Sequence, residues 1–600
     1  MIQKFAFDLL KEWCDKLVEL QITQIKDPNI YGGIMCPSCA RIHGRCGDAI
    51  YPMMYMADKT GDKKYLDCAK LLFDWSERMV RPDDCYNNDT NHEWNGITVF
   101  TQIQLGEALL YHGHLLENSI SERWRERFER TSEYLYIHIE EIGGNVNYPI
   151  SCCASMAVAS KIIKDEKYAK LAKELAIKAL HYLTDEGLIY GEGHPFEAVT
   201  PKGCRPVDIG YNVEESLPNL VLYAILMEDK EVLEAVMKSM EAHLSFMLPD
   251  GAWDNSWGTR NNKWSYWGSR TSDGCQGAYG ILADRRPEFA AAAMKNMQLL
   301  RECTQDGLLY GGTMFDTAGE PPCVHHTFCH AKALAAFLEH GIKEPVVVGN
   351  LPRQMAHGIQ YFPTVHIRLM ANYGWRATVS DYDYEYSSEG HATGGALTML
   401  WNAKIGPVMA ASMGEYSLVE PNNMQLPGYF EDICSTSRLE YWDDGRKYRN
   451  INDLCAEVKE IEGKTASLIV KGTMCDGKKN ADIPYEISYC AEENFIVKGK
   501  CIGKNSRYYF PIIARSTDKV SKMDDYTYSI ERDDACMTIH CSEKIEVNNK
   551  YPRKRKLGEK VSIEKIHRMF NPVSGFEFIP FYINLEKDSS FEVVICIEEK

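Results

Sequence analysis

The spacing of apolar residues changes near the middle of the chain. Up to about residue 345 they recur every three or four positions, as in 65–79 and 217–248, which predicts amphipathic helices. From about residue 359 the spacing is two, which predicts strands. Such segments lie at 362–370, 376–386, 466–473, 495–501, 508–514, 537–541, 576–585 and 591–597. We therefore expect a multidomain α+β fold, with a helical domain at 1–345 and an antiparallel β-sandwich at 346–600, which could divide again near 450–500.

The helical half also repeats on a longer scale. Short polar turns each introduce a helix, and that helix runs into a Gly-rich loop. The turns lie at 62–65, 165–168, 229–232 and 286–289, and the loops at 185–191, 250–254 and 306–311. The period is roughly 60 residues, which suits a helical hairpin with one long loop. Five or six hairpins fit this half and can close into an (α/α) toroid, with equivalent loops on one rim where binding and catalysis are expected.

Charge restricts the class of partner. The formal net charge is −18, so nucleic acid and anionic membranes are excluded as bulk partners. An anionic substrate needs a locally basic cleft, and Arg residues do gather near turns and aromatic residues of the first half. They are Arg41, Arg45, Arg205, Arg260 and Arg270.

The N-terminus and the cysteines bear on the compartment. Residues 1–14 look like the start of an amphipathic helix and not like a signal peptide. No run of about 18 apolar residues indicates a membrane span. We therefore expect a cytoplasmic protein in which the 21 Cys are reduced thiols. A periplasmic or secreted protein whose signal has been removed would look the same.

One loop of the predicted rim is unusually rich in reactive side chains. The stretch 185–217 carries His194 and ends in a helix that begins near Tyr211. One repeat earlier, Asn147 lies at the start of the next helix on the same rim. We therefore expect Asn147, His194 and Tyr211 to face one cleft.

These three side chains suit β-elimination from a uronic acid that is linked through O4. An Asn or Arg donor next to the carboxylate stabilises the charge that develops when the C5 proton leaves. A base removes that proton and an acid protonates the departing O4. Tyr can do either if a cation lowers its pKa, and His can act as the base near neutral pH. This chemistry requires no cofactor.

The layout and one motif resemble the heparinase II/III-like polysaccharide lyases. The motif is G-Y-N-V-E-E-S-L at 210–217, after the D-E-G-L…E-G-H loop at 185–194. Within that group the chain is most similar to the broad-specificity glycosaminoglycan lyases of polysaccharide lyase family 35. The resemblance implies an incomplete toroid, an antiparallel β-sandwich, and cleavage of acidic polysaccharides, glycosaminoglycans above all, to unsaturated uronate products.

The resemblance also implies residue roles. Tyr211 would be the acid and base, Asn147 the neutraliser of the substrate carboxylate, and His194 the second base. Some relatives have His directly after that Asn, whereas this chain has Tyr148. This departure leaves the role of His194 and the preferred uronate epimer open.

Further rim residues are candidates for substrate binding, because Arg pairs with anionic groups and aromatic rings stack on sugars. They are His43, Arg45, His92, Asn95, Arg205, Trp257, Arg260, Trp264 and Arg270. For Arg45 the alternative is a structural ion pair with Asp48 that anchors the first hairpin. For the segment 91–95 the alternative is loop architecture.

Metal ligands are suggested in three places. Cys36, Cys39, His43 and Cys46 have the spacing of half a zinc site, although buried thiols are the alternative. His326 and His330 stand four residues apart after Cys323 and could share an ion. The resemblance implies a structural zinc, manganese or calcium ion in the sandwich, with ligands His366, Asp383 and His391.

Two other functions remain open from the sequence. A glycoside hydrolase needs two carboxylates, and Glu197, Asp208, Glu214, Glu215 and Asp254 are available. A non-catalytic glycan-binding protein needs none. In each case the expected partner is an acidic polysaccharide or oligosaccharide, bound by a monomer or a homodimer.

Overall fold

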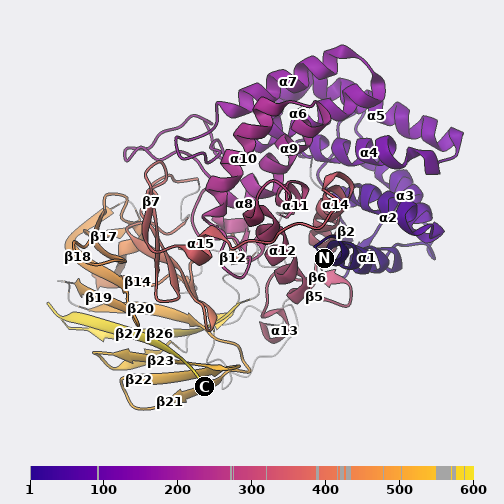
Figure 1. Cartoon of the computed structure of the whole chain (residues 1–600). Coiled ribbons are helices and arrows are strands. Elements are labelled where there is room, and N and C mark those ends of the chain that lie inside the picture. The colour runs from indigo at the N-terminus through magenta and orange to yellow at the C-terminus, as the bar shows by residue number, and fades with distance from the viewer. Residues whose placement is uncertain are drawn as a thin grey trace.

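The computed structural model describes the chain apart from short gaps. The residues outside the description are 1, 39, 91–92, 271–272, 275, 319–320, 387–390, 415–416, 419–424, 427–433, 478, 502, 504, 549–568, 571–575 and 587. Helices occupy the N-terminal half and strands the C-terminal half (Figure 1), so the predicted fold class is confirmed.

The first half is built from hairpins of α-helices. They are α1 (Ile2–Glu19), α2 (Ile50–Thr60), α3 (Lys63–Ser76), α4 (Thr98–His112), α5 (Asn118–His138), α6 (Asn147–Ile163), α7 (Glu166–Leu180), α8 (Ile209–Tyr211), α9 (Leu217–Leu226), α10 (Lys230–Leu244), α11 (Gly277–Ile281), α12 (Pro287–Glu302), α13 (Phe315–Ala318) and α14 (Val324–His340). Short 3₁₀ turns are η1 (Gly44–Ala49), η2 (Glu77–Met79), η3 (Gly113–Leu115), η4 (Ile139–Glu141) and η6 (Asn261–Lys263), and η5 (Asn212–Ser216) is a π turn. Two-stranded ribbons are β1 (Met35–Cys36) with β2 (Arg41–Ile42), β3 (Trp264–Ser265) with β4 (Gly268–Ser269), and β5 (Thr304–Gln305) with β6 (Leu308–Leu309).

The helices form two concentric layers. Helices α2, α4, α6, α9, α11 and α14 contact one another in this order, and α14 also contacts α2. This inner ring is therefore closed. Each inner helix pairs with an outer one, namely α3, α5, α7, α10, α12 and, for α14, the first helix α1. Among the described residues these six pairs confirm the predicted toroid, but the contact of α14 with α2 closes it, whereas the resemblance implied an incomplete one. The two ends of the domain meet where α1 and α14 pack together.

Burial explains why helices alternate between the two layers. The inner helix α4 is buried around almost its whole circumference, including the polar Gln102 and Glu107. The outer helix α5 buries only one stripe, which begins at Trp124 and repeats at Phe128 and Leu135. A helix that is apolar on one stripe covers a core, and a helix that is buried all round lies inside it.

The repeated turns found in the sequence are helix caps. Asp62, Asp165 and Asp229 each accept a hydrogen bond from a backbone N–H in the first turn of α3, α7 and α10. The Gly-rich loop after an outer helix closes as a small hairpin, as at Met247 and Trp253. Gly251 in that hairpin has φ of +94°, and a Cβ there would lie 2.4 Å from the carbonyl carbon of Lys295. Only glycine fits this turn.

The second half consists of two antiparallel sheets. The smaller has the order β11-β10-β9-β8-β7; its strands are β7 (Gly358–Phe362), β8 (Ile367–Asn372), β9 (Trp375–Ser380), β10 (Ala396–Asn402) and β11 (Gly406–Ala410). The larger has the main order β21-β22-β23-β27-β19-β18-β17-β15-β14-β20-β26-β24. Its strands are β14 (Arg438–Asp443), β15 (Arg446–Arg449), β16 (Glu457–Glu460), β17 (Ser467–Asp476), β18 (Lys479–Ala491), β19 (Phe495–Cys501), β20 (Ser506–Ile513), β21 (Lys519–Lys522), β22 (Thr527–Arg532), β23 (Ala535–Cys541), β24 (Ile545–Val547), β25 (Met569–Phe570), β26 (Glu577–Leu585) and β27 (Ser590–Glu599).

The two sheets share one apolar core. Trp375 and Leu400 of the smaller sheet belong to the same buried cluster as Val470, Phe495 and Phe581 of the larger one. A sheet with this many strands curls, and the larger sheet continues across residues 450–500. A further pair of short strands, β12 (Ser417–Leu418) and β13 (Gln425–Leu426), follows β11.

The toroid and the sheets are joined by buried contacts. A short helix, α15 (Pro352–Met355), leads from α14 to β7, and its Arg353 pairs with Asp254 of the toroid at 2.7 Å. Trp401 of β10 donates to Asp250 at 2.9 Å. The apolar core of the toroid extends to Phe362 and Tyr382. Within the described part of the chain, no helix has the length and apolar character that a membrane crossing needs.

Candidate active site

A pocket of about 560 Å³ opens on one rim of the toroid. Every loop that leads from an outer helix to the next inner helix contributes to it, as the sequence repeat predicts. Tyr386, which follows β9, adds a residue from the sheet domain. The lining residues are Arg41, His43, Arg45, Asn88, Asp89, Trp94, Ile97, Phe100, Gly144, Asn145, Tyr148, His194, Tyr211, Glu215, Arg260, Asn262, Lys263, Cys323, His325, His326 and Tyr386.

The pocket is locally basic although the chain is acidic. Arg41, Arg45, Arg260 and Lys263 all line it, whereas the net charge of the chain is −18. Several histidines add donors. The local charge therefore suits an anionic ligand. This is the locally basic cleft that an acidic chain needs in order to bind an acidic substrate.

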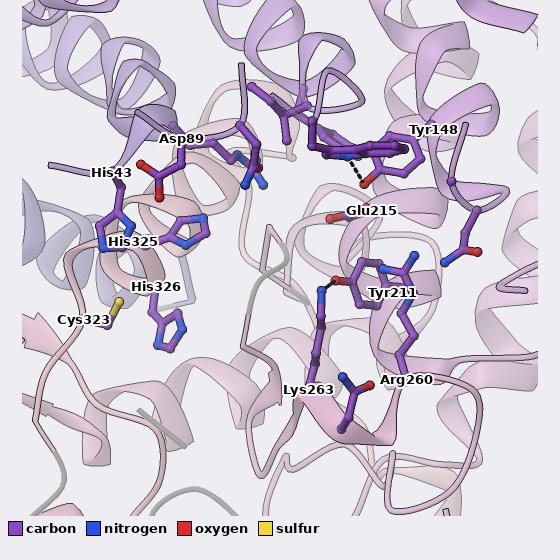
Figure 2. Close-up of a pocket in the computed structure, with 18 of the residues that line it drawn as sticks. His43, Asp89, Tyr148, Tyr211, Glu215, Arg260, Lys263, Cys323, His325 and His326 are labelled. Atoms are coloured by element: carbon purple, nitrogen blue, oxygen red, sulfur yellow. Dashed lines mark hydrogen bonds between the residues drawn. The ribbon is translucent and has the colours of Figure 1, made fainter. Parts of the chain in front are cut away.

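Tyr211 stands between two cations. Its backbone N–H donates to the Asp208 carboxylate at 3.0 Å, which caps α8 and fixes the residue at the start of the helix. Lys263 Nζ donates to the phenol oxygen at 3.1 Å, and the Arg260 guanidinium lies 3.9 Å from the ring centroid. Figure 2 shows both cations on the same side of the pocket as Tyr211. Negative charge on the phenol oxygen would be stabilised there.

Glu215 faces the same pocket from the π turn that follows Tyr211. Its side chain accepts a hydrogen bond from Asn147 Nδ2. Burial, with a further contribution from the charge of Asp273, raises the pKa of Glu215 to about 8, although Arg45 opposes this. At neutral pH the carboxyl group therefore keeps its proton and can donate a hydrogen bond. π turns within α-helices are frequent at functional sites.

Asn147 belongs to a layer behind the pocket wall. It is fully buried, and its backbone N–H donates to Glu192 at 3.2 Å. Glu192 in turn lies 3.3 Å from Arg260, and burial raises its pKa to about 7 while Arg260 opposes the shift. A continuous chain of contacts thus links Arg260, Glu192, Asn147 and Glu215.

His194 lies at the mouth of the pocket and is exposed. Its ring packs on Phe196 with centroids 5.0 Å apart. Of the three residues expected to converge, His194 and Tyr211 line one pocket, whereas Asn147 does not line it and contacts the lining residue Glu215 from behind. Asn145, two residues earlier, lines the pocket itself.

Three of the predicted substrate-binding residues line the pocket, namely His43, Arg45 and Arg260. Arg45 is held at 2.7 Å from both Asp48 and Asp273. Lys332 approaches the same two carboxylates at 2.9 Å. The alternative interpretation of Arg45, a structural ion pair with Asp48, is therefore confirmed, although the residue also lines the pocket.

Three other predicted contacts are corrected by burial. Trp257, Trp264 and Arg270 are at most 2% exposed, and none of them lines the pocket, so they do not contact a polymer bound there. The Trp264 indole donates to the carbonyl of Trp253 at 3.0 Å, and the Trp257 ring packs on Phe246. Both rings belong to the buried apolar cluster of the toroid, so they are core residues.

Two of the remaining predicted contacts, Asn95 and Arg205, do not line the pocket. Asn95 donates to the Tyr134 hydroxyl at 2.9 Å, which supports loop architecture. Arg205 donates to the carbonyl of Glu197 at 2.8 Å and covers the Tyr190 ring. His92 lies outside the described residues.

The metal ligands predicted in the sandwich are not brought together. Asp383 accepts from Thr200 and from the backbone of Lys202. His391 contacts the carbonyl of Tyr382 at 2.9 Å, and His366 faces Asp381 at 3.7 Å. Groups of potential metal ligands in the described part of the chain do not include these three residues.

Several pocket residues were not predicted from the sequence as parts of the site. Lys263 stands in the 253–270 loop whose Trp and Arg residues were singled out, and no local signal separates it from other lysines. Trp94, by contrast, belongs to the 91–95 segment that the sequence did suggest as a substrate contact; it is half-buried, lines the pocket and donates to the Tyr148 hydroxyl at 3.1 Å. Glu215 was considered only as a hydrolase carboxylate.

Comparison with known proteins identifies the class. The model of the ulvan lyase N-terminal domain matches residues 10–354, and that of the ulvan lyase C-terminal domain matches 359–598. A broad-specificity ulvan lyase of Formosa agariphila is 38% identical over 598 residues, covering 96% of this chain and 91% of that protein.

Solved structures agree on the fold. Heparinase III matches with a TM-score of 0.54 at 11% identity, over 92% of this chain and 76% of that one. The chondroitin AC lyase of Streptomyces coelicolor A3, in complex with chondroitin sulphate, matches with a TM-score of 0.53 at 10% identity, over 100% and 80%.

The toroid, the curled sheets and the basic rim pocket, taken with these relatives, define a polysaccharide lyase that acts on acidic polysaccharides. The predicted heparinase-like class is thereby confirmed. Within that class, the chain belongs to the ulvan lyase family. The family is named for ulvan, whereas the sequence had pointed first to glycosaminoglycans.

Proposed function

We propose that this lyase cleaves ulvan or a closely similar acidic polysaccharide at uronate residues, and that Tyr211 transfers the protons of the elimination. The substrate is suggested by the name of the 38% identical relative. The catalytic assignment rests on geometry: the Tyr211 hydroxyl lies in the basic pocket with Lys263 Nζ at 3.1 Å and Arg260 over its ring.

In this mechanism the substrate carboxylate meets Glu215. The protonated carboxyl group of Glu215 donates to the substrate carboxylate, and Asn147 holds Glu215 in place from behind. The hydrogen bond withdraws charge from the uronate, so its C5 proton becomes more acidic. Asn147 therefore acts as a positioning residue for Glu215, which differs from the direct role that the resemblance implied.

Proton transfer then falls to Tyr211 and His194. Lys263 Nζ lies at the Tyr211 oxygen and the Arg260 guanidinium over its ring. In the proposed step the deprotonated Tyr211 oxygen takes the C5 proton of one epimer and returns a proton to the departing O4. His194 stands at the pocket mouth and serves as the base for a C5 proton on the opposite ring face. One bond from C4 to oxygen breaks, and a C4–C5 double bond forms. The elimination uses side chains of the chain alone.

The alternative function, a glycoside hydrolase, is supported less than a lyase, because Asp208, Asp254 and Asp89 are buried or already paired. Asp208 accepts from the backbone of Tyr211 and of Arg260, and Asp254 is paired with Arg353. Both are fully buried. Asp89 lines the pocket but accepts from the backbone of Gly44 and lies 3.3 Å from Arg41.

A substrate panel tests the proposal. Purified protein is incubated with ulvan, heparan sulfate, chondroitin sulfate, hyaluronan and alginate, and products are followed by the ultraviolet absorbance of the unsaturated uronate and by mass spectrometry. We expect unsaturated products from ulvan at the highest kcat/KM. Saturated products that have gained water would contradict elimination, and a preference for another polymer would contradict the substrate assignment.

A further inference from the structure

A compact group of soft ligands lies on the side of the pocket away from Tyr211. Cys36 Sγ, Cys323 Sγ and a ring nitrogen of His43 lie within 4.8 Å of one another, and all three residues are buried. His43 and Cys323 line the pocket together with His325 and His326 (Figure 2). The proposed elimination uses none of these residues.

The three ligands come from opposite ends of the toroid. Cys36 lies in β1 and His43 directly precedes η1, both in the loop between α1 and α2. Cys323 is the N-cap residue of α14, the last inner helix. The pair α1 and α14 and the pair α14 and α2 form the seam at which the ring closes. About 280 residues of chain separate His43 from Cys323.

The chemistry of this set favours zinc. Thiolate and imidazole ligands select Zn²⁺ over hard cations such as Mg²⁺ and Ca²⁺. In a tetrahedral zinc site with Zn–S bonds of about 2.3 Å, ligand atoms lie about 3.7 Å apart. The observed separations need only small side-chain adjustments to reach this value. Two thiolates also neutralise the charge of the ion, which lowers the cost of burying it.

We propose that Cys36, His43 and Cys323 bind one Zn²⁺ ion that joins the first and last hairpins of the toroid. The ion stabilises the seam of the ring and thereby fixes the wall of the pocket formed by His43, His325 and His326. This site differs in position and ligands from the sandwich site predicted from the resemblance. Of the four residues with half-site spacing in the sequence, Cys36 and His43 belong to this group, Cys46 does not, and Cys39 lies outside the described residues.

Metal content provides the test. The full chain is purified with a thiol reductant, incubated with a slight excess of ZnCl₂, desalted, and analysed by inductively coupled plasma mass spectrometry. We expect one equivalent of zinc in the unmodified protein and in Cys46→Ala, a matched buried cysteine of the same loop. In the double variant Cys36→Ser/Cys323→Ser, zinc affinity falls at least about tenfold.

A second measurement uses the unmodified protein, so its result does not depend on whether the variants fold. The unmodified protein reconstituted with Co²⁺ should show thiolate-to-cobalt charge-transfer absorption, and a chelator should lower its Tm. Absence of stoichiometric zinc in the unmodified protein, equal zinc in the double variant, or a Cys36–Cys323 disulfide in non-reducing peptide maps would overturn the proposal. None of these readouts depends on lyase activity.

Discussion

At the scale of single residues, the chemistry of the site depends on which charged side chains are buried next to one another. Glu215 lines a pocket that also contains Arg45, Arg260 and Lys263, and Glu192 lies behind it, next to Arg260. Burial favours the protonated carboxyl of Glu215, while Lys263 and Arg260 place positive charge beside the Tyr211 side chain. The proposed elimination uses both features, a neutral acid and a phenol next to cations.

Glu215 makes the activity depend on pH in a defined direction. Its raised pKa of about 8 means that the donor is present below this pH and is lost above it. We expect kcat/KM of the unmodified enzyme to fall as pH rises through about 8. In Glu215→Gln the amide donates at every pH, so this fall should disappear. An unchanged alkaline limb in the Gln variant would show that Glu215 does not control it, and Glu215→Ala should be impaired throughout.

Lys263 should affect turnover more than substrate binding, because it touches the reacting phenol. We expect Lys263→Met to lower kcat by about 10²-fold or more, as removal of a preorganised donor does, with a smaller change in KM. Steady-state kinetics on ulvan measure both. Lys238→Met is the matched control, since Lys238 is exposed on the outer helix α10. A loss confined to KM would assign Lys263 to substrate binding alone.

At the scale of elements, the helical repeat was predictable because its signals are local. Asp caps such as Asp165 and apolar spacing in segments such as 155–183 are properties of neighbouring residues. The position of a side chain across the ring is not local. Trp257 and Lys263 stand six residues apart in one loop, yet the first is buried and the second lines the pocket. Only the tertiary fold separates them.

Short strands were harder to predict than helices. The strands β21 and β22 are largely exposed or half-buried along their length, so their apolar alternation is weak.

The proximity of Cys323 to Cys36 could not be predicted from the sequence for a different reason. Spacing reveals ligands within one loop, whereas these two residues meet because the ring closes.

A buried ion network ties the first hairpin to the last. Burial alone would raise the pKa of Asp48, but Lys332 and Arg45 outweigh it and lower the pKa. We expect Asp48→Asn to lower the free energy of unfolding by about 3–5 kcal/mol, because it leaves two buried cations with one fewer partner. Urea denaturation measures this. The exposed pair of Asp8 with Lys4 provides the control, since Asp8→Asn should cost at most about 1 kcal/mol. Equal effects would contradict the structural role of the network.

At the scale of the whole molecule, the toroid and the sheet domain are held together by contacts between buried residues of both domains. Arg353 and Asp254 are both buried at the junction, and Tyr386 brings the sheet domain into the pocket wall. The active site therefore depends on the junction as well as on the toroid.

This junction predicts coupled unfolding. We expect thermal unfolding followed by tryptophan fluorescence and by far-ultraviolet circular dichroism to give coincident transitions. Arg353→Ala leaves Asp254 buried without this cation and should lower both transitions together. Two separate transitions in the unmodified protein would show that the domains unfold independently.

The central claim is that the Tyr211 phenol transfers the protons of an elimination reaction. Its most direct test is the rate of unsaturated-product formation from ulvan by Tyr211→Phe, compared with Tyr148→Phe in the same pocket, whose phenol accepts a hydrogen bond from Trp94. We predict a loss of about 10²–10⁴-fold for Tyr211→Phe and a rate within about tenfold of the unmodified enzyme for Tyr148→Phe. Retained turnover in a folded Tyr211→Phe enzyme would contradict the mechanism.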